Sequence, residues 1–116
     1  DDIKDYFEKR LNKLFHLGHD NVLLDPGFGF GKTLSQNYEI LRRLDEFSSF
    51  GLPLVVGLSR KSMIYKLLDS SPEDALNGTS VLNTMALLKG ANILRVHDVR
   101  EAIETIKLVT AYNNPV

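Results

Sequence analysis

A chain of 116 residues, 43% hydrophobic and 25% charged, is long enough for one hydrophobic core and too short for two. Its 14 Lys and Arg residues against 15 Asp and Glu leave a formal net charge of -1, which favours neither nucleic acid nor an anionic membrane as a partner. The absence of cysteine excludes disulfides, thiolate metal sites and cysteine nucleophiles. No apolar run approaches the roughly 20 residues of a membrane span, no signal-peptide pattern opens the sequence, and we expect a cytoplasmic protein.

Helices and short apolar strands alternate along the chain. Helical spacing of apolar residues predicts a first helix over residues 3–17, closed by Gly18. A strand and a helix then follow three times over. The strands are predicted at 21–25, 54–59 and 91–96, and the helices at 35–47, at 61–68 followed by 71–90, and at 99–112.

Three details of these helices are predicted from local signals. We expect Ser35 to be an N-cap and the Asn77-Gly78 pair to interrupt the helix that starts near residue 71. Apolar periodicity in the rest of that helix predicts a set of inward-facing side chains: Val81, Leu82, Met85 and Leu88.

The predicted strands are almost continuously apolar, which is typical of a parallel sheet covered on both faces. Three such strands cannot close a barrel, and they leave two exposed edges. We therefore expect an α/β fold in which residues 1–116 form one domain, a fragment of a larger protein that begins inside one of its helices.

The segment Asp25–Lys32 (DPGFGFGK) lies between the first predicted strand and the next helix. Glycines at alternate positions permit positive φ and let the backbone approach a ligand closely. Their spacing fits neither a Walker phosphate loop nor a dinucleotide-binding loop. We interpret the segment as a ligand-facing turn whose Asp25 carboxylate accepts paired N–H donors from a cationic or guanidine-like edge.

Polar residues also follow the other two predicted strands, as SRKS at 59–62 and RVHD at 95–98. In parallel α/β folds the carboxyl ends of the strands meet where the ligand binds. Because strand residues two apart share a face, Arg95 and His97 lie together. We expect Lys61, Arg95 and His97 to hold an anion such as a phosphate group.

Each strand end, taken alone, also has a structural interpretation. Asp25 can end its strand by accepting nearby backbone N–H groups, and residues 60–61 can be a solvated helix start. Arg95 and His97 can pair with Asp98 in a structural network. The ligand-binding interpretation is favoured because all three strand ends are polar together.

In this order and approximate spacing, the segments LDPGFGFGK (24–32), GLSRKS (57–62) and RVHDV (95–99) resemble those of dihydropteroate synthases. The resemblance covers essentially the whole chain. It implies the C-terminal part of a (β/α)8 TIM barrel, from the fifth helix through the sixth, seventh and eighth strands with their helices. This family condenses 6-hydroxymethyl-7,8-dihydropterin pyrophosphate with p-aminobenzoate in folate biosynthesis, giving 7,8-dihydropteroate and pyrophosphate, and sulfonamides compete for its p-aminobenzoate site.

The resemblance implies substrate-binding roles around the pterin. Asp25 would bind the amino-pyrimidine edge of the pterin, and Lys61 would contact both the pterin and p-aminobenzoate. Arg95 would stack on the pterin and, with His97, hold the departing pyrophosphate. Of these four residues, Lys61, Arg95 and His97 would be the catalytic ones.

The resemblance also implies the surroundings of the second substrate and the partners of the chain. Ser59 would meet the carboxylate of p-aminobenzoate in a pocket shaped by Phe30. The Mg²⁺ of the complete enzyme would be held by an asparagine outside these residues, so no metal ligand is expected within the chain. We also expect the chain to be inactive alone and the last two helices to pair two subunits as a homodimer.

Two other interpretations stay open at this stage. A pterin-binding methyltransferase has a similar barrel with an acid for the pterin, but methyl transfer does not need the cations of SRKS and RVH. A non-catalytic binding module derived from such a barrel is the alternative from a different class, and fold analogy alone cannot separate it from an enzyme.

Overall fold

The computed structural model describes residues 2–18, 22–29 and 31–114 of the chain. Its helices and strands alternate in the α/β order expected from the sequence. The α-helices and β-strands in chain order are α1 (Asp2–His16), α2 (Leu34–Arg42), β1 (Val55–Val56), α3 (Ser62–Tyr65), α4 (Leu76–Leu88), β2 (Ile93–Leu94) and α5 (Val99–Asn113). Two 3₁₀ helices, η1 (Leu44–Phe50) and η2 (Pro72–Asp74), lie between them.

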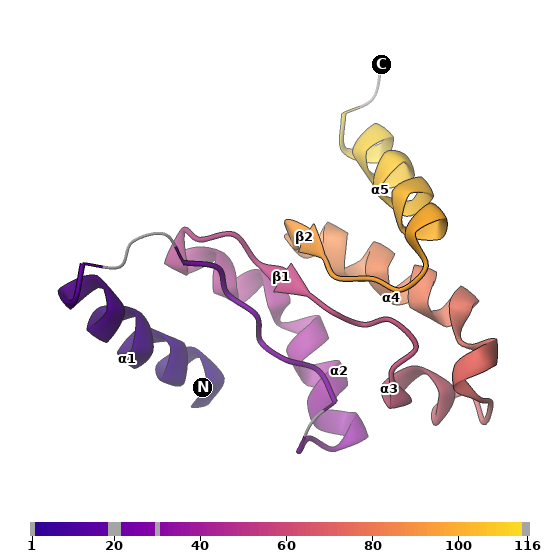
Figure 1. Ribbon diagram of the computed structural model, residues 1–116, viewed down its shortest axis with the longest axis horizontal. Coiled ribbons are helices and arrows are strands. Elements are labelled where there is room, and N and C mark those ends of the chain that lie inside the picture. Colours follow the sequence, from indigo (N-terminus) through magenta and orange to yellow (C-terminus); the bar gives the residue numbers. More distant parts are fainter. Residues whose placement is uncertain (1, 19–21, 30, 115–116) are drawn as a thin grey trace.

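Parallel extended segments form the centre of the molecule (Figure 1). β1 pairs with β2, with Val55 opposite Ile93. The segment around Leu24 joins the other side of β1 through a single parallel bridge to Leu54. The middle position in the sheet therefore belongs to β1, between the segment that leads to Asp25 and the segment that leads to Arg95.

The strands are shorter than predicted. A three-stranded sheet is not confirmed among the described residues, where two residues pair in each of β1 and β2 and one bridge involves Leu24. Side chains take over from the backbone ladder at both ends of the β1–β2 pair. Asn92 Oδ1 accepts the Leu54 N–H at 2.8 Å, and Ser59 Oγ accepts the His97 N–H at 3.1 Å. The chain stays extended there without strand pairing.

The start of α2 differs from the prediction. Ser35 is not the N-cap. Thr33 is, because its side chain accepts the Gln36 N–H at 3.1 Å while the Gln36 side chain accepts the Thr33 N–H at 2.9 Å. This reciprocal pair is a capping box. The predicted helix 35–47 in fact ends at Arg42 and tightens into η1.

The predicted break at Asn77-Gly78 is wrong. α4 runs through both residues, and the glycine serves packing: a Cβ at position 78 would clash with Ile64 of α3. Close approach of two helices is a known use of glycine within a helix. The start signal near residue 71 instead produces η2, one short turn before α4.

The inward face of α4 was predicted incorrectly. Of the four residues expected to face the core, Leu82 is buried, whereas Val81, Met85 and Leu88 are exposed. The buried stripe of α4 also includes small and polar side chains, namely Thr79, Asn83 and Ala86. Hydrophobicity alone therefore pointed to the wrong side of this helix.

The core lies where the helices pack on the extended segments. Leu44, Val56, Leu58 and Met63 are fully buried there. α2 and α4 lie behind the extended segments in the view of Figure 1, with α1 and α5 at opposite ends of the molecule. Within the ranges described above, no helix combines the length and the apolar character that a membrane crossing requires.

Candidate functional site

An open pocket of ≈ 730 Å³ lies at the carboxyl ends of the extended segments. Its wall combines residues 27–29 and 31 of the glycine turn, residues 60–62 at the start of α3, and Arg95 after β2. Three separate parts of the chain therefore meet at one cavity, as the sequence predicts. The pocket is wide enough to admit a small organic ligand.

Arg95 reaches across the sheet to Asp25. Arg95 Nη1 lies 2.9 Å from Asp25 Oδ2, which makes an ion pair between the two outer segments. The guanidinium passes over Gly57 of the middle segment, where a Cβ would lie 2.6 Å from Arg95 Nη2. The missing side chain at position 57 thus opens the path on which the two charges meet.

Asp25 also fixes the turn that follows it. Its Oδ1 accepts the Gly27 N–H at 3.0 Å, which is the structural role considered for a carboxylate before a proline. The structural interpretation of Asp25 is therefore confirmed, since one oxygen orders the turn, and the other oxygen faces Arg95. A carboxylate with two acceptor oxygens can serve both partners.

Lys61 lies against the opposite wall. Its Nζ donates to the Phe28 carbonyl at 2.8 Å, which joins the start of α3 to the glycine turn. Burial lowers the pKa of the Lys61 ammonium, and the nearby positive charge of Arg95 lowers it further, against the raising effect of Asp25. The pocket thus holds a partly desolvated cation, which binds an incoming anion more strongly than a solvated one.

The glycine turn is held by a residue that the sequence analysis did not identify. Asn37 is buried in the first turn of α2, and its Oδ1 accepts the Gly29 N–H at 2.7 Å. Gly27, Gly29 and Gly31 have positive φ values of 69°, 98° and 68°, so the turn needs glycine for its shape. The sequence signal for this contact was the position of Asn37, a side-chain amide in the first turn of the helix that follows a glycine-rich loop.

Arg60 was regarded only as part of a solvated helix start, and it has more partners than this. Its guanidinium pairs with Asp98, with Nε 3.0 Å from Oδ2 and Nη2 3.1 Å from Oδ1. The hydrogen bond from Arg60 lowers the pKa of the Asp98 carboxyl. The partner of Asp98 is therefore Arg60, whereas Arg95 pairs with Asp25.

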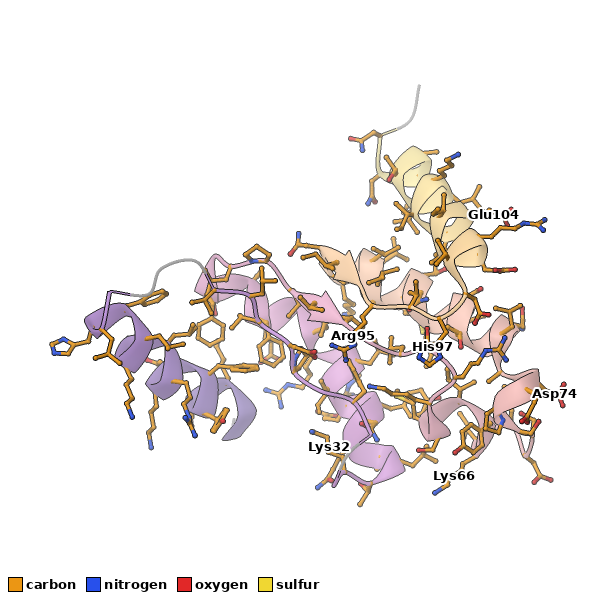
Figure 2. The ribbon with its side chains drawn as sticks, viewed as in Figure 1. Lys32, Lys66, Asp74, Arg95, His97 and Glu104 are labelled. Carbon is orange, nitrogen blue, oxygen red and sulfur yellow. The ribbon has the colours of Figure 1, made fainter. Side chains whose placement is uncertain are left out.

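The other predicted site residues lie in different surroundings. Ser59 is buried, and its hydroxyl oxygen accepts the backbone N–H of His97. The His97 side chain is exposed and is not on the wall of the pocket, although Figure 2 shows it beside Arg95 on the segment before α5. Phe30 lies outside the described residues. Ser62, in contrast, does line the pocket.

The site suits an anionic ligand with a flat polar edge. Lys61 and Arg95 supply positive charge, Asp25 supplies an acceptor, and a serine and the glycine-turn backbone line the space between them. In the described parts of the chain no group of three or more His, Asp or Glu residues could hold a metal ion. The arrangement supports recognition and charge stabilisation by side chains.

Comparison with known proteins gives a consistent result. The sequence profile of the family described as "Pterin binding enzyme" matches residues 1–97. The dihydropteroate synthase of Escherichia coli (strain K12) is 46% identical over 112 residues, which is 95% of this chain and 40% of that protein. The dihydropteroate synthase of Haemophilus influenzae is 40% identical over 115 residues, 97% of this chain and 42% of that protein.

Solved structures agree with the sequence comparison. A Yersinia pestis dihydropteroate synthase in complex with a sulfonamide drug has a TM-score of 0.94 and 42% identity, covering 99% of this chain and 43% of that one. The Thermus thermophilus enzyme in complex with 4-aminobenzoate has a TM-score of 0.89 and 40% identity, covering 95% and 43%. The fold is therefore that of part of a TIM barrel, and the chain spans about two fifths of the length of the curated relatives it matches.

Proposed function

Because the chain belongs to the pterin-binding enzyme family, we propose that it supplies the C-terminal part of a dihydropteroate synthase. The observation that carries the proposal is that Lys61 and Arg95 line one pocket, while Arg95, laid across Gly57, is paired with Asp25. The substrates would be 6-hydroxymethyl-7,8-dihydropterin pyrophosphate and p-aminobenzoate. The products would be 7,8-dihydropteroate and pyrophosphate.

The pterin would bind between Asp25 and Arg95. The Asp25 carboxylate is suited to the adjacent N–H donors of an amino-pyrimidine, because it can accept two parallel hydrogen bonds. In the ligand-free chain one of its oxygens faces Arg95. Pterin binding would therefore draw Arg95 off Asp25, and the released guanidinium would stack on the face of the ring.

Departure of pyrophosphate would be assisted by the cations of the pocket. The bond between the pterin methylene carbon and the diphosphate oxygen breaks, and the electron pair leaves with pyrophosphate. Arg95 and His97 would stabilise the negative charge that develops on the leaving group, with Lys61 close to the pterin. The amine nitrogen of p-aminobenzoate then bonds to the methylene carbon and releases a proton, so no side-chain nucleophile is needed.

The p-aminobenzoate ring would bind next to the pterin. The Thermus thermophilus relative was solved with 4-aminobenzoate and the Yersinia pestis relative with a sulfonamide, which supports a site for this ring in the present protein. We propose Ser59 and Phe30 for it on the ground of the family resemblance. Ser62 is a third candidate, since it lines the pocket while the Ser59 hydroxyl is already engaged by His97 N–H.

A pterin-binding methyltransferase is the closest competing function. Its substrate would also need a carboxylate such as Asp25, but methyl transfer releases no diphosphate. The positions of Lys61 and Arg95 in the pocket favour the synthase, because two cations beside one carboxylate match an anionic leaving group. A non-catalytic module would need neither cation to be held in place.

The expected Mg²⁺ is not assigned to this chain. The Asp25 carboxylate, beside the pocket, is occupied by Arg95 and the Gly27 N–H, so these residues do not fit a magnesium site. We keep the proposal that its protein ligand lies outside these 116 residues, and we derive no step through the ion. A cytoplasmic location also stays a prediction from the sequence.

For the homodimer, we propose the face formed by α4 and α5 as the contact between two copies. A groove of ≈ 430 Å³ lies between these helices and is lined mainly by apolar side chains. Leu88, Leu108 and Tyr112 on its wall are more than half exposed, which is unusual for side chains of this size on one surface.

The experiment that tests the function uses two proteins. One is the 116-residue chain, and the other, here called the joined enzyme, is the same chain fused to the part of the Escherichia coli relative that precedes the matched region. We expect the joined enzyme to form dihydropteroate and the chain alone to form none, because the groups that stabilise the transition state act as a unit. A joined enzyme that folds and binds neither substrate in calorimetry would overturn the proposal.

A further inference from the structure

Arg60 has the most hydrogen-bonded side chain near the pocket, yet the proposed reaction gives it no role. Its guanidinium holds Asp98 with two nitrogens, and its third nitrogen, Nη1, donates to the carbonyl of Pro72 at 2.7 Å and of Glu73 at 3.0 Å. Three of its nitrogens thus join the start of α3, the turn η2 and the start of α5. A planar fork of this kind is suited to arginine and not to lysine.

The backbone of Arg60 is also held in an unusual conformation. Its φ of 52° lies in the left-handed region, which a non-glycine residue rarely adopts. The Arg60 N–H donates to Thr79 Oγ1 at 3.0 Å, and the buried Thr79 hydroxyl donates in turn to the Ala75 carbonyl at 2.7 Å. Strained backbone persists only where its surroundings fix it, and it is concentrated at functional sites.

The neighbours of this residue explain why its position matters. Lys61, the next residue, puts its ammonium into the pocket, and Ser59, the preceding one, accepts the His97 N–H. Asp98 in turn directly follows His97, which follows the Arg95 segment. The Arg60–Asp98 pair and the Ser59–His97 hydrogen bond therefore cross-link the same two segments, side by side, at the wall of the pocket that Arg60 lines.

We propose that Arg60 and Asp98 are positioning residues for the reaction, a pair that holds Lys61 on one segment in register with Arg95 and His97 on the other. This inference rests on the proposed function, since it assigns Lys61, Arg95 and His97 to one reaction. Arg60 lines the pocket, but all three of its guanidinium nitrogens already donate to Asp98 or to the carbonyls of η2, so its role is to position its neighbours. The pair acts by keeping fixed the distance between Lys61, beside the pterin, and the side chains of Arg95 and His97, beside the leaving group. Catalysis is sensitive to errors of about 1 Å in such a distance.

The replacement of each partner by its nearest neighbour in chemistry tests the pair. Arg60→Lys keeps the charge and loses the fork, and Asp98→Asn keeps one acceptor and loses the charge. In the joined enzyme we expect each change to lower kcat/KM by about tenfold or more, measured well below the unfolding temperature of the variant. The double variant should be no more than about threefold worse than the poorer single variant, because the two residues act as one unit.

The matched control is Arg100→Lys. Arg100 forms an ion pair with Glu104 within α5, and its side chain is largely exposed. It should leave kcat/KM within about twofold of the parent. Folded Arg60→Lys and Asp98→Asn enzymes that also keep kcat/KM within about twofold of the parent would overturn the positioning role. A parent joined enzyme that folds but shows no turnover would count against the proposed function instead.

Amide hydrogen exchange of the 116-residue chain gives a second, activity-independent test. In Arg60→Lys we expect the His97 amide, which donates to Ser59, to exchange at least about tenfold faster, with the Val55 and Asn37 amides unchanged. Faster exchange at the His97 amide alone is the result expected if the pair positions this segment. A uniform acceleration at all three amides, or an unchanged His97 amide, would contradict it.

Discussion

The pocket at the carboxyl ends of the strands and the groove between α4 and α5 differ in what holds their side chains. In the pocket, Lys61 and Arg95 are each fixed by a hydrogen bond or an ion pair that crosses between segments, and Asp25 is the partner of Arg95. In the groove, the large side chains are apolar and exposed, Leu108 and Tyr112 among them. The pocket is thus organised before a ligand arrives, whereas burial of the groove needs a second surface. The first is suited to chemistry and the second to association.

The strongest test of an organised pocket is Lys61→Met. Removal of one preorganised cation should reduce dihydropteroate formation by the joined enzyme by about 100-fold to 1,000-fold. Lys66→Met is the matched control, because Lys66 is exposed beyond α3 and points away from the pocket in Figure 2. We expect the control to remain within about twofold of the parent. Equal losses in both variants would show that the pocket cation has no special role.

Lys61→Met also makes a prediction about stability and pH. The folded chain lowers the pKa of Lys61 below its ordinary value of 10.5, so the charged form opposes folding. Below the lowered pKa this cost is fully present, and it is relieved as the pH rises from there towards 10.5. The free energy of unfolding of the variant relative to the parent should therefore be constant at neutral pH and decrease as the pH rises towards 10.5, whatever the loss of the Lys61 hydrogen bond to the Phe28 carbonyl costs. Denaturant unfolding at several pH values measures this, and a difference that grows with pH would contradict the assignment.

Gly57→Ala tests whether the path of Arg95 organises the site. The new methyl group would occupy the position of the guanidinium, so Arg95 must move away from Asp25. We expect kcat/KM of the joined enzyme to fall by about tenfold to 100-fold, since the misplaced group is the one proposed to hold the leaving pyrophosphate. In an Arg95→Ala background the same methyl group should add little. A full additional loss in that background would mean that Gly57 acts on something other than Arg95.

Asn37→Leu tests the support of the glycine turn and should have a smaller effect. The substitution leaves the Gly29 N–H without its acceptor, which costs about 1–3 kcal/mol when the group stays buried. We expect a loss of unfolding free energy within this range and a decrease of about tenfold in kcat/KM. Asn37→Asp keeps an oxygen for the Gly29 N–H and should restore most of both. If Asn37→Asp is no more stable and no more active than Asn37→Leu, the hydrogen bond from the Gly29 N–H to Asn37 does not support the turn.

Leu108→Glu tests the groove and should leave the chemistry almost unchanged. A charge on this exposed apolar position of α5 would have to be buried on association, so the joined enzyme should shift from dimer to monomer in sedimentation. Turnover should stay within about twofold of the parent. The control is Thr110→Glu, an exposed position of α5 outside the groove wall. A parent that sediments as a monomer at all concentrations would exclude the proposed dimer.

The sequence predicted the segments that form the pocket better than it predicted the residues that hold those segments in place. The glycine turn, SRKS and RVHD each follow an apolar run, and parallel strands bring such positions to one edge, so local pattern was enough. Arg60 and Asp98 are 38 residues apart, and no local signal links them. Asn37 resembled any polar residue of a helix start. The face of α4 was misjudged because Thr79 and Asn83 are buried while Met85 is exposed, a choice made by tertiary packing and not by hydrophobicity.

The central claim is that Asp25 recognises a pterin in a pocket shared with Lys61 and Arg95. Calorimetric titration of the joined enzyme with 6-hydroxymethyl-7,8-dihydropterin pyrophosphate tests this claim most directly. Asp25→Asn is the variant. Asp45→Asn is the control, because the Asp45 side chain is exposed and its oxygen lies 3.8 Å from the Lys89 ammonium. The account predicts binding by the parent and the control and a loss of at least about tenfold in affinity for Asp25→Asn. Equal affinity in all three proteins would contradict it.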